Sequence, residues 1–255
     1  MDHVLFSIAR RNGRETTAGI FEIGEKILRK LFLHIGTHKT GTTSFQSYLL
    51  DNRERLGLAG VAVCTETHRK FGPIANCLSL ANAVLRPSLM TVARMTGDAK
   101  SPGVWRYAKA MGHVTKFLSN KDATHFILSA EAFCFAREPT EMSKIERMFS
   151  ASDVEVVPVV CFRNDEAWRE SWFGEIDRWQ QRFHRSHGEG MGDIRGDWYF
   201  DRSAILRFWR QIGDVRTVDF DEAVSKHGTI LPSLLEAMEI SDIGDTEKYF
   251  LNARN

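Results

Sequence analysis

The stretch of residues 30–50, KLFLHIGTHKTGTTSFQSYLL, constrains the fold of this chain more than any other. It begins with an apolar run, residues 31–35, that has the length and composition of a buried strand. The run passes directly into a loop rich in glycine and threonine, and from Ser44 onward apolar residues recur at helical spacing. The stretch therefore predicts a strand, a tight loop and a helix in immediate succession.

The residues of this loop predict an anion-binding site. The first N–H groups of a helix have no acceptor within the helix, and the helix dipole adds a partial positive charge at that end. Gly36 and Gly41 allow the backbone to approach a ligand closely. Further hydrogen-bond donors are the hydroxyl groups of Thr40, Thr42, Thr43 and Ser44.

The position of the lysine indicates which anion is bound. The P-loop of nucleoside triphosphatases reads GxxxxGK[ST], with the lysine directly after the second glycine. Here Gly36 and Gly41 keep that spacing, but Thr42 occupies the lysine position and Lys39 lies inside the loop. The loop resembles the 5′-phosphosulfate-binding loop of sulfotransferases, KxGTT or KxGTTS, and the matching residues are Lys39-Thr40-Gly41-Thr42-Thr43-Ser44.

A second part of the resemblance follows the β-branched run of residues 154–162, which is typical of a central parallel strand. In sulfotransferases an arginine at a strand end and a serine eight positions later hold the 3′-phosphate of the donor. Arg163 and Ser171 have that spacing, and Trp172 stands where an aromatic residue follows in the family. A guanidinium group presents a planar pair of donors that suits a phosphate. Pro158 inside the run predicts an edge strand or a bulge, because proline has no N–H to donate.

Glu131 follows a third strand-like run, residues 124–128, and is a candidate general base. Many bacterial sulfotransferase-like sequences show a similar Ser-x-Glu at this place. A carboxylate could accept the proton of an acceptor hydroxyl if partial burial raises its pKa. Two other interpretations are open: Ser129 caps a helical turn that carries Glu131 in its first turn, or Glu131 holds Lys39 in place.

Composition limits the class of protein. The 255 residues suit one α/β domain with insertions, and 34 basic against 33 acidic residues argue against bulk nucleic-acid binding. The four cysteines lack the spacing of a metal site or a disulfide framework. No segment reaches the length of a membrane span or resembles a secretory signal, so we expect a cytoplasmic protein.

The expected fold is a P-loop NTPase-like three-layer α/β fold, with a central parallel sheet flanked by helices. A leading segment, residues 1–29, precedes a sulfotransferase domain of residues 30–240, and a polar tail covers residues 241–255. Within the domain, residues 65–120 predict a helical insert. The aromatic, basic and glycine-rich residues 174–203 predict either an acceptor lid or a disordered surface loop.

The resemblance implies transfer of a sulfuryl group from 3′-phosphoadenylyl sulfate (PAPS) to a hydroxyl or amine acceptor, such as a carbohydrate or a small metabolite. Lys39 would neutralise the charge on the departing oxygen, the loop residues up to Ser44 would hold the 5′-phosphate, and no metal would be required. The alternatives are a nucleotide-dependent P-loop kinase or NTPase, and a non-catalytic protein that binds PAPS or its bisphosphate product. The kinase alternative predicts a lysine after Gly41, which this chain lacks.

Overall fold

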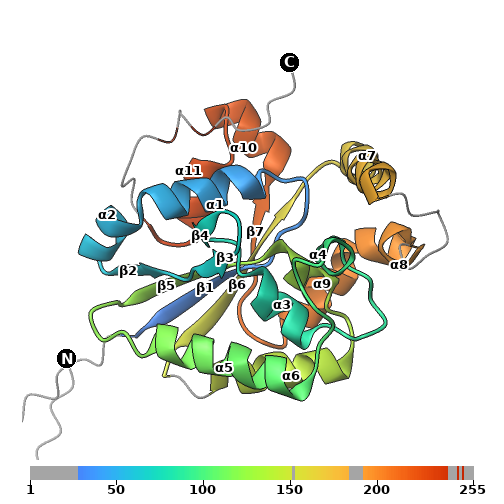
Figure 1. Cartoon of the computed structure of the whole chain (residues 1–255). Helices are drawn as coiled ribbons and strands as arrows, with labels where there is room; N and C mark the ends of the chain where they lie inside the picture. The colour runs from blue at the N-terminus through green and yellow to red at the C-terminus, as the bar shows by residue number, and fades with distance from the viewer. Residues whose placement is uncertain (1–27, 151–152, 184–191, 241–245, 247–248, 250–255) are drawn as a thin grey trace, which may run out of the picture.

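The computed structural model describes residues 28–150, 153–183 and 192–240, together with residues 246 and 249. Its centre is a five-stranded parallel sheet with the strand order β2-β5-β1-β6-β7 (Figure 1). These strands are β1 (Lys30–His34), β2 (Val61–Val63), β5 (His125–Ser129), β6 (Glu155–Phe162) and β7 (Arg216–Asp219). A sheet of this kind with helices on both faces confirms the predicted fold class.

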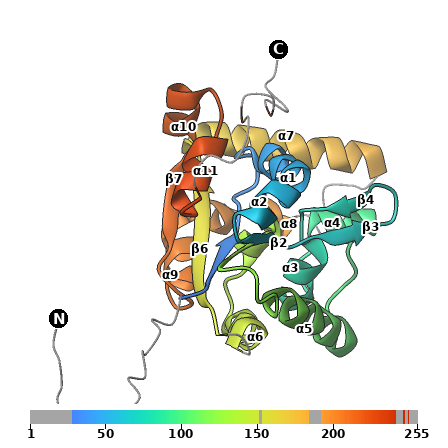
Figure 2. The ribbon, with the colours of Figure 1, turned by 90° about the vertical axis from the view of Figure 1, so that its left-hand side faces the viewer.

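Helices cover both faces of the sheet, as Figures 1 and 2 show. One face carries α1 (Thr42–Asp51), α2 (Arg53–Leu58), α10 (Phe220–His227) and α11 (Leu231–Ala237). The other carries α3 (Leu78–Val84), α5 (Val104–Leu118), α6 (Pro139–Ser150) and α9 (Arg202–Trp209). The remaining helical segments lie toward one end of the sheet: α4 (Val92–Thr96), the 3₁₀-helix η1 (Glu131–Phe135), α7 (Asp165–Phe183), α8 (Gly192–Arg195) and the 3₁₀-helix η2 (Asp197–Phe200).

Successive side chains of the central strand β1 point to opposite faces of the sheet, and apolar side chains are buried on both faces. Leu31 and Leu33 pack into the core under α3, α5 and α6, whereas Phe32 packs against α1 and α11. All three side chains are fully buried. An uninterrupted apolar strand of this type is expected where helices cover both faces of a parallel sheet.

The prediction of an edge position or a bulge for Pro158 was wrong. β6 lies inside the sheet, between β1 and β7. Val159 and Cys161 exchange hydrogen bonds with the β1 side, so the nitrogen of Pro158 faces the β7 side. The ladder with β7 begins only at Val159, which pairs with Arg216. Pro158 therefore sits just before the point at which a ladder donor would be required.

Two local predictions also need correction. The helix after the loop breaks at Asn52 into α1 and α2. Residues 65–120 contain an antiparallel hairpin, β3 (Glu66–His68) and β4 (Gly72–Ile74), before their helices. Of the segment predicted as a lid or loop, residues 174–183 belong to α7, and residues 184–191 lie outside the described part of the chain.

The two ends of the chain are described only in part. The leading segment lies outside the described residues except for Leu28 and Arg29, and so does the tail except for Thr246 and Tyr249. Within the part of the chain that the structure describes, no helix combines the length and apolarity needed to cross a membrane.

The topology indicates where a ligand would bind. From β1 the chain passes through α1 to β2, on one side of the sheet, whereas from β6 it passes through α7 and α9 to β7, on the other side. In open α/β sheets, ligands bind beyond the carboxyl ends of the strands where the connections diverge in this way. The loop after β1 and Arg163 after β6 both lie at that position.

Candidate functional site

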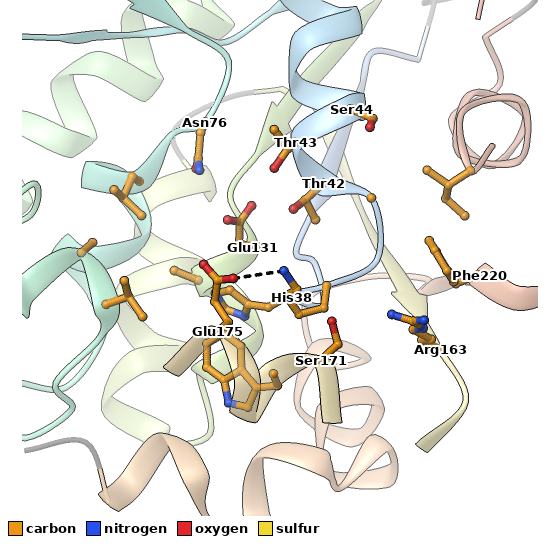
Figure 3. Close-up of a pocket in the computed structure, with 18 of the residues that line it drawn as sticks. His38, Thr42, Thr43, Ser44, Asn76, Glu131, Arg163, Ser171, Glu175 and Phe220 are labelled. Carbon is orange, nitrogen blue, oxygen red and sulfur yellow. Dashed lines mark hydrogen bonds and ion pairs between the residues drawn. The ribbon is translucent and has the colours of Figure 1, made fainter. Parts of the chain in front are cut away.

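A cleft of about 880 Å³ opens at this end of the sheet. Its walls are formed by the loop after β1, the start of α1, Asn76, α4, η1, α7 and the segment from Phe220 to Ile230. The residues predicted from the sequence that line it are Lys39, Gly41, Thr42, Thr43, Ser44, Glu131, Arg163 and Ser171. Figure 3 shows Arg163 and Ser171 on one side of the loop, and Glu131 with Asn76 on the other. One cavity therefore joins the two strand ends that the sequence singled out.

The loop holds a conformation that depends on its glycines. Gly36 and Gly41 have φ angles of 101° and 77°, and the φ of Lys39 is 68°. L-residues with a side chain rarely adopt this region of backbone space. A Cβ on Gly41 would also lie 2.8 Å from Cγ2 of Ile230. The second glycine of the motif is thus required both by backbone conformation and by close packing.

The start of α1 retains the features of an anion site. Its N-cap, Gly41, provides no side-chain hydrogen bond, and the first turn contains no acidic residue. The N–H groups of that turn therefore lack both a capping side chain and a repelling carboxylate. The hydroxyl of Thr40 does not belong to this set of donors, contrary to the prediction, because it donates to the carbonyl oxygen of Thr37 at 2.6 Å and the residue is buried.

Lys39 forms an ion pair with Glu175 of α7, with 3.2 Å between Nζ and Oε2 (Figure 3, dashed line). The partner of this lysine is therefore a residue on the opposite wall of the cleft, and the interpretation in which Glu131 holds Lys39 was wrong. The two side chains are 28% and 25% exposed, so the pair borders the open cleft rather than the protein core.

Glu175 connects the loop to the second half of α7. It also accepts hydrogen bonds from Arg178 and, at 2.8 Å, from Nε1 of Trp179. Partial burial acts to raise its pKa, but the hydrogen bond from Arg178 and the charge of Lys39 outweigh burial, and the net pKa lies below the ordinary value. Glu175 is therefore ionised near neutral pH and is a poor candidate for a general base.

Glu131 has the opposite electrostatic setting. Burial raises its pKa, and hydrogen bonds with the side chains of Gln46, Thr42 and Asn76 only partly offset that increase. Ser129 does not cap the turn that begins at Glu131; that turn has no side-chain cap. The capping interpretation was therefore wrong for Ser129, although Glu131 is the first residue of η1 as that interpretation required.

Arg163 presents its side chain at the other end of the cleft. Its guanidinium lies over the ring of Phe220, 5.1 Å from the centroid, and Nε is 4.0 Å from Oδ1 of Asp221. Nε is buried and makes no hydrogen bond with a described residue. Ser171 lies two turns along α7 and lines the same cleft. The arginine thus retains unused donor capacity next to a serine hydroxyl.

His38, directly before the lysine, also lines the cleft. Its Nδ1 lies 2.8 Å from the hydroxyl of Tyr199, and its ring packs against Phe135 and Trp172. Burial, with a smaller contribution from the charge of Lys39, lowers the pKa of His38 to about 3. The imidazole is therefore neutral over the whole physiological range and serves to anchor the loop to η2.

The residues that sequence reasoning missed are Asn76, Glu175 and Phe220, which line the cleft, and Gln46, which donates a hydrogen bond to the cleft residue Glu131. Glu175 could have been predicted from the sequence, because it is four positions after Ser171 and a helix places such residues on one face. Asn76 could not, since it reaches the cleft through the hairpin β3–β4 and a bridge to Ser129.

Three comparisons place the chain among known proteins. No protein-family model matches it, and no curated protein sequence matches it. Among solved structures, the chain is similar to a "Sulfotransferase Domain from the Curacin Biosynthetic Pathway". The two are 14% identical, the alignment covers 89% of this chain and 79% of that one, and the TM-score is 0.45. So distant a likeness assigns neither an activity nor a substrate to this chain.

Proposed function

We propose that this protein is a sulfotransferase that moves a sulfuryl group from PAPS to a hydroxyl or amine acceptor. The observation that carries the proposal is the cleft lined both by Lys39 and residues 41–44 of the loop and by the pair Arg163 and Ser171. These two sets are suited to two different phosphates of one nucleotide. The resemblance to sulfotransferases in the sequence implied the same two sets, and their common cleft supports the proposal.

The residues present fit the two ends of such a donor. The first turn of α1 offers backbone N–H groups and the hydroxyl of Thr43 to a 5′-phosphate, whereas the hydroxyl of Thr42 is hydrogen-bonded to Glu131. Arg163 and Ser171 line the other end of the cleft, where they offer a guanidinium and a hydroxyl. Both suit a 3′-phosphate. The guanidinium of Arg163 stacks on the ring of Phe220, which also lines the cleft and offers an aromatic surface to a bound base.

The donor would supply an activated sulfuryl group, and the chain's own residues would direct its transfer. Lys39 is placed to neutralise the negative charge on the 5′-phosphate oxygen as the bond from that oxygen to sulfur breaks. Glu131 is placed to take the proton of the attacking acceptor group as the new bond to sulfur forms. Burial raises the pKa of Glu131, which makes its carboxylate a stronger base than an exposed glutamate.

The ion pair of Lys39 and Glu175 adds a step to this scheme. For Lys39 to reach a donor oxygen, its Nζ must leave Glu175 or share its hydrogens with it. Glu175 keeps two other donors, Arg178 and Trp179, so its charge remains compensated when the lysine moves. The lysine can therefore change partners without leaving a carboxylate unpaired.

A P-loop kinase or NTPase remains the alternative from a different reaction class, and a binding protein without turnover is the second. Calorimetry with adenosine 3′,5′-bisphosphate in the presence of a chelator tests the first alternative. We expect tight binding without metal, whereas binding of ATP that requires Mg²⁺ would favour the kinase. Incubation with PAPS and a fractionated cell extract, followed by mass spectrometry, tests the second. An acceptor heavier by one sulfuryl group supports turnover, and donor binding without any product supports the binding protein.

A further inference from the structure

Glu131 is the end of a chain of hydrogen bonds that runs into the core of the protein. Nε2 of Gln46 donates to Oε2 of Glu131 at 2.9 Å and lies 3.2 Å from Oγ of Ser129. Oγ of Ser129 in turn lies 2.8 Å from Nδ1 of His34. The four residues come from β1, α1, the end of β5 and η1, so the chain connects the central strands of the sheet to the cleft.

The direction of these hydrogen bonds follows from the groups involved. An amide nitrogen can only donate, so Ser129 accepts from Gln46 and its own proton is available for Nδ1 of His34. Burial lowers the pKa of His34 to about 3, and the ring is therefore neutral and able to accept at Nδ1. The ring is also held by an edge-on contact with Phe45, with 5.0 Å between centroids.

The core has no packing requirement for these polar groups. His34 and Ser129 are 0% and 1% exposed, and Nε2 of His34 has no hydrogen-bond partner in the part of the chain that the structure describes. Burying an unpaired ring nitrogen costs free energy. Apolar residues at both positions would fill this part of the sheet without that cost. The pair of His34 and Ser129 has a role that apolar residues could not perform if it holds the side-chain amide of Gln46 in place.

The other titratable groups around Glu131 either keep one charge state near neutral pH or are paired with each other. His34 and His38 stay neutral because burial lowers the pKa of each to about 3. The thiol of Cys134, on the same 3₁₀-helix, stays protonated because burial raises its pKa to about 12. Lys39 and Glu175, on the loop and on α7, are paired with each other.

We propose that Gln46 is a positioning residue. It fixes the Glu131 carboxylate at the wall of the cleft and is itself held in place by Ser129 and His34. This inference rests on the proposed function, since it assigns Gln46 a role in the reaction for which Glu131 is the candidate base. The amide donates to the carboxylate and so stabilises its ionised form, while the second contact with Ser129 prevents the amide from rotating away. Figure 3 shows Glu131 between Asn76 and Thr42.

The variant that tests this is Gln46→Met, which keeps the length of the side chain and removes its donor. Loss of one hydrogen bond to a carboxylate should raise the pKa of Glu131 by about one unit. Two measurements follow this shift. Carboxyl ¹³C NMR of glutamate-labelled protein, with Glu131→Gln to assign the resonance, gives the titration without any turnover. The pH dependence of sulfation should show its acid limb displaced upward by the same amount, and the rate at high pH should fall because the ionised carboxylate is no longer fixed by Gln46.

Two further variants make the result decisive. Ser129→Ala should shift the titration in the same direction by a smaller amount, because Gln46 keeps its bond to Glu131 but loses its second anchor. Ser47→Ala, on the same helix and outside the hydrogen-bond chain, should leave both measurements unchanged. An unmoved titration in folded Gln46→Met would overturn the proposal, and so would a moved titration with an unmoved acid limb. If no acceptor is sulfated by the unaltered protein, the proposed function fails, and the NMR titration still decides whether Gln46 holds the carboxylate.

Discussion

Replacement of Arg163 by alanine tests whether the second end of the cleft holds a phosphate. A hydrogen bond to a charged group contributes about 1.5–3 kcal/mol. The guanidinium has an unpaired Nε, and its ion pair with the half-exposed Asp221 spans 4.0 Å. Such a pair is worth about 0–1 kcal/mol, so little must be given up when Arg163 turns to a ligand. The net loss for the alanine variant is about 2 kcal/mol, which is about a thirtyfold increase in Kd.

The assay compares two ligands that differ by one phosphate. Calorimetry of adenosine 3′,5′-bisphosphate and of adenosine 5′-monophosphate, against the unaltered protein and Arg163→Ala, gives a double cycle that isolates the coupling between Arg163 and the 3′-phosphate. We expect the full thirtyfold loss for the bisphosphate and almost none for the monophosphate. Arg169→Ala is the matched control, because Arg169 lies on α7, stacks on Phe200 and does not line the cleft. Equal losses for the two ligands would refute the assignment of Arg163 to the 3′-phosphate.

Three further predictions concern the loop and the candidate base. Lys39→Ala should abolish sulfation, measured by mass spectrometry of the acceptor, while binding of the bisphosphate by calorimetry persists; unchanged sulfation would exclude the role given to Lys39. Gly41→Ala should lower the free energy of unfolding, measured in urea, by about 1–2 kcal/mol, because Gly41 has a φ of 77° and the added Cβ would collide with Ile230. Gly57→Ala is the control and should not lower it, because a Cβ at position 57 would meet no atom within 4 Å. The raised pKa of Glu131 gives the folded protein a contribution to stability that is present below the ordinary value of 4.5 and is lost as pH rises through the folded value. Glu131→Gln should therefore raise the Tm relative to the unaltered protein at about pH 8 but not at about pH 4; an equal effect at both values would contradict the shift.

Much of the fold could be predicted because its signals are local. The apolar run of β1 and the glycines after it specify a strand, a turn and a helix within one short stretch, and the β-branched residues of β6 specify a second buried strand. The position of Pro158 could not be predicted, since it depends on where β7 starts to pair, and that is a property of a segment more than fifty residues away.

The residues of the candidate site also fall into two groups, those that could be predicted from local sequence and those that could not. The residues that were predicted follow strand ends or lie at fixed spacing on one helix, as Arg163 and Ser171 do. Asn76 reaches the cleft through its bridge to Ser129, and Gln46 reaches Glu131 through a hydrogen bond between two elements that are distant in sequence. The hydroxyl of Thr40 illustrates the converse, because a motif shows the type of residue and not the direction of its side chain.

The central place of β1 determines when the cleft can form during synthesis. β1 precedes both of its neighbours in the sequence, and Lys30 pairs with His125 on one side and with Glu155 on the other. When only the first half of the chain has left the ribosome, β1 therefore has no paired strand. The loop after β1 then lacks the neighbouring strands that hold its position. The cleft between the loop after β1 and Arg163 can therefore form only after residues 155–163 have emerged from the exit tunnel. Until residues 125–129 emerge, both backbone edges of β1 lack a strand partner, and until β6 follows, one of them still does.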